Sequence, residues 1–134
     1  MVLIDTIYIH NSGGKILLNI LIKKIVSIGQ ESFFFLFDNR LDPEIHKELK
    51  SDNFRMLKAN EQSRKRFYKQ NKKSFNNYFC FSNVPPPIYI EKPVIIYFHN
   101  DIILDPTKSN IGLTQKFKFR LKNIYINVKN HKRY

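Results

Sequence analysis

The fold is decided by one stretch of sequence, LIDTIYIHNSGGKILLNILIKKIVSI, which spans residues 3–28. Leu3–Ile9 is mostly apolar and β-branched, which predicts a buried strand. His10–Gly14 has the composition of a turn, and Lys15–Ile28 is apolar-rich and longer than an ordinary strand. We interpret Lys15–Ile28 as a helix that lies on a sheet and ends at Gly29.

The rest of the chain continues this alternation. Further strands are predicted at Ser32–Phe37, Phe54–Lys58, Tyr78–Phe81 and Pro93–Phe98, and helical segments at Leu41–Lys50 and Asn60–Lys73. Strands that alternate with helices are typical of βαβ units, whose strands are parallel. We therefore predict an α/β fold, with a mostly parallel sheet and flanking helices.

The length and the charge of the chain limit the number of domains and the kind of partner. The 134 residues (16.1 kDa, 43% hydrophobic) are enough for one domain with a core. The net charge of +12 predicts an anionic partner. It is concentrated in residues 44–80 (+6) and 108–134 (+8), whereas residues 1–43 are neutral and residues 81–107 carry −2.

The basic segment 108–134 has two interpretations. Lys116–Lys122 alternates like a strand, but Leu113, Phe117, Leu121, Ile124 and Val128 recur at helical spacing. We favour a basic amphipathic helix that follows a domain at residues 1–107.

Several classes of protein are disfavoured. The single cysteine, Cys80, forms no internal disulfide, which fits a reducing compartment. The N-terminus has no basic region of a signal peptide, and no apolar run reaches the ~18 residues of a membrane span. The four histidines show no metal-ligand spacing, so no metal site is expected. A cytoplasmic protein is the default expectation.

Two candidate sites follow predicted strands. His10–Gly14 opens a helix, whose free N–H groups favour an anion; it is not a dinucleotide fingerprint, and the alternative is an ordinary turn. Tyr97–Asp101 lies at the carboxyl end of a strand, where open α/β sheets place ligand groups. Its alternative is a polar cluster in a loop.

Two further segments are candidates for binding. Phe81–Pro87 is stiffened by three prolines, and it either lines a cleft or serves as a rigid connector, which we favour. The helix at Asn60–Lys73 suits an anionic membrane or nucleic-acid phosphates, with solvated charge as the alternative. Its basic residues are Arg64, Lys65, Arg66, Lys69, Lys72 and Lys73.

Three motifs together resemble a known family. Tyr8–Lys15, Phe79–Pro87 and Tyr97–Asp101 occur in the order found in the N-terminal half of bacterial GT-B glycosyltransferases, the retaining family-4-like enzymes of polysaccharide and lipopolysaccharide assembly. The resemblance covers roughly residues 1–105. It implies a Rossmann-like domain, the acceptor-side half of a two-domain enzyme that moves sugar from a nucleotide-sugar donor to a glycan or lipid-linked acceptor.

The resemblance also implies roles for individual residues. Gly13 and Gly14 would approach the donor diphosphate, and His99 would contact the donor sugar as the catalytic residue. The other residues expected to bind donor or acceptor are Asn11, Ser12, Asn83, Asn100 and Asp101. No cofactor or metal is needed by this class, and the basic helices would seat the enzyme on the inner membrane face.

The chain departs from the family in one large respect. It ends before a second Rossmann-like domain, so we expect it not to transfer sugar alone and to need a separate donor-domain polypeptide. The alternative function is a small basic module that binds a membrane or nucleic acid without catalysis. Nucleic acid is the less favoured partner, because the charge lies on two elements that suit a membrane surface.

Overall fold

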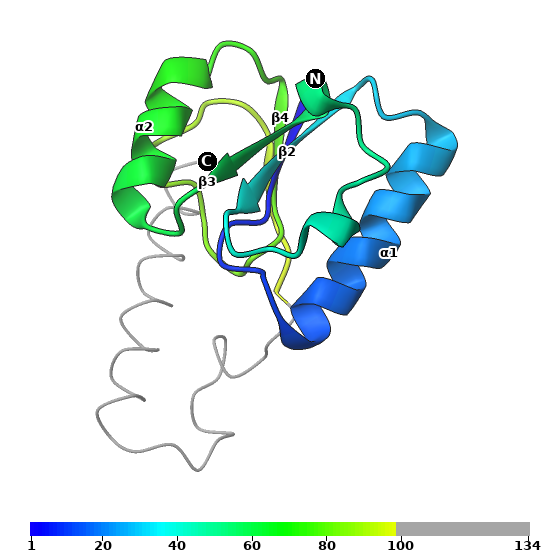
Figure 1. The fold of residues 1–134 in the computed structure, drawn as a ribbon. Helices are drawn as coiled ribbons and strands as arrows, with labels where there is room; N and C mark the ends of the chain where they lie inside the picture. Colours follow the sequence, from blue (N-terminus) through cyan, green and yellow to red (C-terminus); the bar gives the residue numbers. More distant parts are fainter. Residues whose placement is uncertain (99–134) are drawn as a thin grey trace, which may run out of the picture. The chain divides into compact units, whose positions relative to one another are not determined.

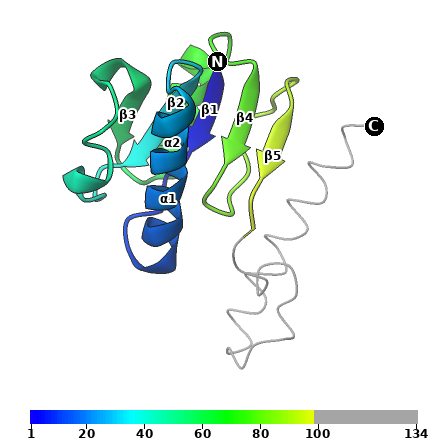
Figure 2. The same cartoon turned by 90° about the vertical axis from the view of Figure 1, so that its right-hand side faces the viewer.

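The computed structural model describes residues 1–98 (Figure 1). Within these residues one sheet contains five strands: Val2–Asp5 (β1), Phe33–Asp38 (β2), Phe54–Leu57 (β3), Asn77–Cys80 (β4) and Val94–Ile96 (β5). Their order is β3-β2-β1-β4-β5, and every pairing is parallel (Figure 2). The predicted α/β fold with a Rossmann-like parallel sheet is confirmed.

Two α-helices cover opposite faces of the sheet. Ser12–Ile28 (α1) connects β1 to β2, and Glu61–Asn71 (α2) connects β3 to β4 (Figure 1). The chain therefore builds outward from β1 in one direction and then returns to add β4 and β5 on its other side. This places the topological switch point, where such sheets bind ligands, between the carboxyl ends of β1 and β4.

The first strand and helix have different ends from those predicted. The strand expected over Leu3–Ile9 stops at Asp5, because the chain turns through Tyr8, whose φ is 82°. The helix expected from Lys15 already begins at Ser12, so both glycines lie in its first turn. The hydrophobic pattern locates each element, but the turn chemistry moves its end.

The helix predicted over Leu41–Lys50 is wrong. Only a 3₁₀ turn forms there, at Pro43–Ile45. The backbone N–H of Lys50 instead donates to the side chain of Gln30, and Leu49 is buried. Tertiary contacts thus hold this segment in a non-helical path. The expected boundary at residue 107 and the segment 108–134 lie outside the described residues.

The core has one part on each face of the sheet. Alternate strand residues point to opposite faces, so Ile4 packs with α1 and Leu3 with α2. The α1 side includes Leu18, Ile22, Phe35 and Phe37, and the α2 side includes Leu36, Phe67, Tyr68 and Tyr78.

A fully buried ion pair joins α2 to the central strand. Arg64 of α2 and Asp5 of β1 are both 0% exposed, and Arg64 Nη2 and Nε lie 2.8 and 2.9 Å from Asp5 Oδ2. The hydroxyl of Tyr68 donates to the same oxygen at 2.7 Å. Burial alone would lower the pKa of Arg64, but the neighbouring Asp5 raises it above its usual value, so the guanidinium of Arg64 stays charged.

The same guanidinium also holds the chain after β4. Arg64 Nη2 donates to the backbone carbonyls of Val84 and Pro85, at 3.3 and 3.0 Å. One side chain therefore links β1, α2 and the proline segment. A buried charge that loses its partner is strongly unfavourable. Loss of Arg64 therefore removes its contacts to β1 and to the proline segment at the same time.

Replacement of Arg64 by Met will lower the free energy of unfolding by about 3–5 kcal/mol, because Asp5 is left buried without its counter-charge. Urea unfolding followed by circular dichroism measures the change. Arg66, exposed on the same helix, is the matched control, and Arg66→Met should change stability by less than about 0.5 kcal/mol. Equal stability of the two variants would contradict the assignment.

Candidate functional site at the carboxyl edge of the sheet

The candidate site is built from the loops that leave the carboxyl ends of β1, β2 and β4. The first of these loops carries Tyr8–Asn11, the second Arg40, and the third Ser82 and Asn83. Since β1 pairs with both β2 and β4, the three loops lie along one edge of the sheet. This edge includes the switch point, and it brings together the motifs at residues 10–14 and 82–83.

Two buried aspartates fix the loop between β1 and α1. The N–H of Ile7 donates to Asp5 Oδ1 and that of Tyr8 to Asp38 Oδ2, both at 3.2 Å. Thr6 adds a side-chain hydrogen bond to the carbonyl of Leu36. These bonds hold Tyr8 in a left-handed conformation, which is unfavourable for a bulky residue and recurs at binding sites. The entrance to α1 is thereby held in place.

The N-terminus of α1 is left open to a ligand. Its N-cap residue Asn11 forms no side-chain hydrogen bond to the first turn, and the first turn carries no acidic residue. The side chain of Asn11 instead lies 3.3 Å from His10 Nε2. Helix N-termini favour anions because their N–H groups are unpaired and the helix dipole is positive there.

The two glycines of this turn have different roles. A Cβ on Gly13 would meet no atom within 4 Å, so the space beside this residue is open. A Cβ on Gly14 would lie 3.3 Å from Cγ2 of Ile9, so Gly14 permits close packing of the loop on the helix. Neither has a positive φ; the left-handed residue here is Ser12, at 54°. The predicted approach of a ligand therefore applies to Gly13 rather than to Gly14.

Asp38 and Arg40 form a second ion pair on this edge. Asp38 is fully buried, and Arg40 Nε and Nη2 contact its two carboxylate oxygens at 2.9 and 2.6 Å. Burial alone would raise the pKa of Asp38, but the hydrogen bonds and charge of Arg40 outweigh it and lower the pKa. His10 lies beside the pair, with Nδ1 3.9 Å from Asp38 Oδ2. That separation is too long for a direct hydrogen bond.

The loop after β4 supplies a buried polar group at the switch point. Ser82 is 6% exposed, and its hydroxyl has no hydrogen-bond partner within residues 1–98. Asn83 is 8% exposed and left-handed, with φ 59°. Buried hydroxyls are normally satisfied, so the hydroxyl of Ser82 is available for a ligand or a water molecule. His99, Asn100 and Asp101 lie outside the described residues.

The basic residues of α2 divide into two groups. Lys65, Arg66 and Lys69 of α2, and Lys72 and Lys73 directly after it, are exposed, which agrees with a cationic face. The prediction that Arg64 belongs to this face is wrong. Arg64 is fully buried against Asp5 and takes no part in the face. The reason is helical spacing, since Arg64 shares one side of the helix with Phe67 and Tyr68, three and four residues on.

The sequence analysis predicted neither the buried pair of Asp5 and Arg64 nor the pair between buried Asp38 and the half-exposed Arg40. Asp38 and Arg40 were not singled out, because partners two residues apart across a turn have no characteristic motif. In the sequence, Asp5 is an acidic residue within the mostly apolar strand predicted over Leu3–Ile9. A carboxylate inside a buried strand requires a cationic partner, and this requirement was the available indication of Arg64.

Comparisons with known proteins add no identification. No family model, curated protein sequence or solved structure matches this chain. Within residues 1–98, no group of three or more potential ligands is placed to hold a metal ion. In the same part of the chain, no helix is long and apolar enough to cross a membrane.

Replacement of Arg40 by Met will lower the free energy of unfolding at neutral pH and change how that free energy depends on pH. In the parent protein the lowered pKa of Asp38 adds stability above the unfolded pKa of about 3.9, and this is lost as the pH falls through the folded pKa. Without Arg40, burial dominates and raises that pKa. The stability difference should therefore be largest near pH 7 and shrink towards pH 3.

Urea unfolding at several pH values measures this difference. Arg55→Met is the control, since Arg55 is exposed and forms no ion pair within the described part of the chain. A difference between Arg40→Met and the parent protein that stays constant from pH 7 to pH 3 would contradict the role of Asp38.

Proposed function

We propose that the described domain is the acceptor-side domain of a glycosyltransferase that moves a sugar from a nucleotide-sugar donor to a glycan or lipid-linked acceptor. The observation that carries the proposal is the open, uncapped N-terminus of α1, with free space beside Gly13 and no acidic residue in its first turn. The parallel sheet and its switch point support the same conclusion.

The chemistry required of this edge is stabilisation of a leaving group. When a sugar is transferred, the glycosidic bond to the nucleoside diphosphate breaks and negative charge develops on the departing phosphate. Preorganised N–H groups at a helix N-terminus stabilise such charge without reorganisation. In the proposal, the backbone of Ser12 and Gly13 contacts the diphosphate, and Ser82 and Asn83 bind hydroxyl groups of a sugar.

The remaining parts of the proposal concern residues and chains beyond the described domain. His99, with Asn100 and Asp101, is proposed to contact the donor sugar. A separate donor-domain polypeptide is the proposed partner that completes the nucleotide site. The described domain alone accounts for an anion site and a rigid edge, and both support a role in positioning donor and acceptor.

Replacement of Gly13 by Asp tests the proposed diphosphate contact. A carboxylate at this open position repels an anion. Its interaction with the helix dipole stabilises the folded protein by about 0.3–1 kcal/mol. Binding of pyrophosphate, measured by calorimetry, should weaken at least tenfold while the urea midpoint is unchanged or higher. Gly13→Asn is the control of equal size without charge, and it should retain most of the affinity.

Equal affinities of the Asp and Asn variants would contradict the contact. Absence of pyrophosphate binding by the parent protein would contradict the proposed anion site at the start of α1, which carries the proposed function.

A second candidate function is attachment to an anionic membrane surface, in agreement with the exposed lysines and arginine of α2. Charge reversal at Lys65, Arg66 and Lys69 should reduce binding to phosphatidylserine vesicles at least tenfold at low salt, because each basic residue near such a surface contributes about 1 kcal/mol. Sedimentation with the vesicles measures this. Charge reversal at Arg55, on β3, is the control. Unchanged sedimentation of the triple variant would contradict the attachment.

A further inference from the structure

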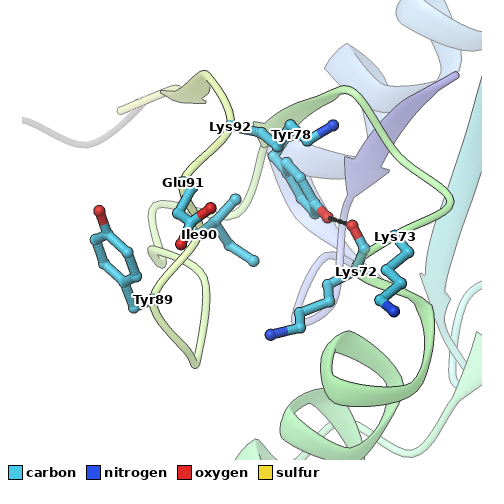
Figure 3. Close-up of a pocket in the computed structure, with 7 residues that line it drawn as sticks. All are labelled: Lys72, Lys73, Tyr78, Tyr89, Ile90, Glu91 and Lys92. Carbon is cyan, nitrogen blue, oxygen red and sulfur yellow. Dashed lines mark hydrogen bonds between the residues drawn. The ribbon is translucent and has the colours of Figure 1, made fainter.

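A cavity of about 360 Å³ lies on the α2 side of the molecule, away from the carboxyl edge (Figure 3). Its charged lining consists of Lys72, Lys73, Lys92 and Glu91. Its aromatic and apolar lining consists of Tyr78, Tyr89 and Ile90. The volume is within the range of small-molecule sites, about 300–1,000 Å³.

The walls of the cavity are fixed by the core. Tyr78 is buried, its N–H donates to the carbonyl of Pro93, and its hydroxyl donates at 2.9 Å to the carbonyl of Lys72 (Figure 3). Ile90 is 4% exposed and belongs to the α2-side core. The end of α2 and the segment before β5 are thus both anchored.

The lining is cationic. Three lysines and one glutamate belong to the lining, and none of the four takes part in an ion pair within residues 1–98. The side chain of Lys72 extends toward the segment that carries Tyr89 and Ile90 (Figure 3). Unpaired ammonium groups around a cavity attract phosphate, which lysine binds as a point charge.

An exposed aromatic ring stands at the same cavity. Tyr89 is 63% exposed, although large aromatic side chains usually bury most of their surface. A tyrosine ring next to lysines is the combination that binds nucleotides, because the ring stacks on a base while the ammonium groups neutralise the phosphate. Stacking of this kind is worth about 1–3 kcal/mol per base.

We infer that this cavity binds a nucleotide, with its phosphate on Lys72 and Lys92 and its base on the ring of Tyr89. The site is separate from the carboxyl edge and independent of the proposed function. The nucleotide comes either from the free pool or from a nucleic-acid strand, since the two share a base and a phosphate.

The test measures binding of UMP, AMP, inorganic phosphate and a hexauridylate to the full chain by calorimetry. UMP or AMP should bind at least tenfold more tightly than phosphate. The combined change Lys72→Ala and Lys92→Ala should weaken nucleotide binding at least tenfold. Tyr89→Ala should weaken it at least fivefold, and Tyr89→Phe should restore it because the ring is retained.

Two controls separate this site from other basic surfaces. The combined change Lys65→Ala and Lys69→Ala removes the same charge from exposed positions of α2 outside the cavity, and it should leave binding within twofold. Gly13→Asp should also leave it unchanged, because Gly13 belongs to the carboxyl edge. Urea midpoints confirm that each variant folds.

Each result of these binding measurements either supports or overturns the nucleotide site. Tighter binding of the hexauridylate than of UMP, with the same sensitivity to Tyr89, supports the site and assigns it to a strand; equal binding supports it and assigns it to free nucleotides. Equal loss in the two double-lysine variants would overturn the inference, because the charge would then act diffusely. Phosphate binding as tight as that of UMP would overturn it too, as would loss of binding in Gly13→Asp alone.

Discussion

The buried pair of Asp5 and Arg64 is the interaction on which the rest of the domain depends. It joins the central strand to α2 and, through the carbonyls of Val84 and Pro85, to the segment after β4. It therefore sets the position of α2 over the sheet. It also directs the chain after β4 across the α2 side, where Ile90 enters the core and completes the lysine-lined cavity.

A second consequence concerns the carboxyl edge. Asp5 and Asp38 end adjacent strands and are each paired with an arginine, while their remaining acceptor capacity is used by the N–H groups of Ile7 and Tyr8. The loop that leads into α1 is thus held by charges that are already compensated. The positive potential at the start of α1 is not neutralised by a side-chain cap or by an acidic residue in its first turn. A rigid loop and an open helix N-terminus are together the features on which the proposed anion site depends.

The sequence predicted the elements better than the contacts between them. Hydrophobic runs located all five strands and α1, since burial on both faces of a parallel sheet leaves continuous apolar segments, and the polar, basic composition of residues 60–73 indicated α2. The prediction of a helix over Leu41–Lys50 failed. There the side chain of Gln30 accepts a hydrogen bond from the backbone N–H of Lys50, which a helix would have used. Arg64 was also predicted on the surface, because composition alone does not say which basic residue of an amphipathic helix faces a buried acid.

Only part of the candidate site was predicted, because local patterns can be recognised in the sequence and tertiary contacts cannot. The turn at residues 10–14 was recognisable because glycines before an apolar helix are a local pattern. The open space beside Gly13 and the hydroxyl of Ser82, which has no partner within residues 1–98, depend on tertiary packing, which no local pattern encodes. The cavity at Tyr78 and Tyr89 joins segments that precede β4 and β5, and their closeness follows only from strand order.

The central claim is that the carboxyl edge between β1 and β4 is the functional face of this domain. Titration of the ¹⁵N-labelled protein with UDP-glucose, followed by amide chemical shifts, tests it most directly. The account predicts that large shift changes fall on Ser12–Lys15 and on Ser82 and Asn83, with changes elsewhere restricted to the cavity at Tyr89. Changes confined to residues away from this edge, or no change at all, would contradict it.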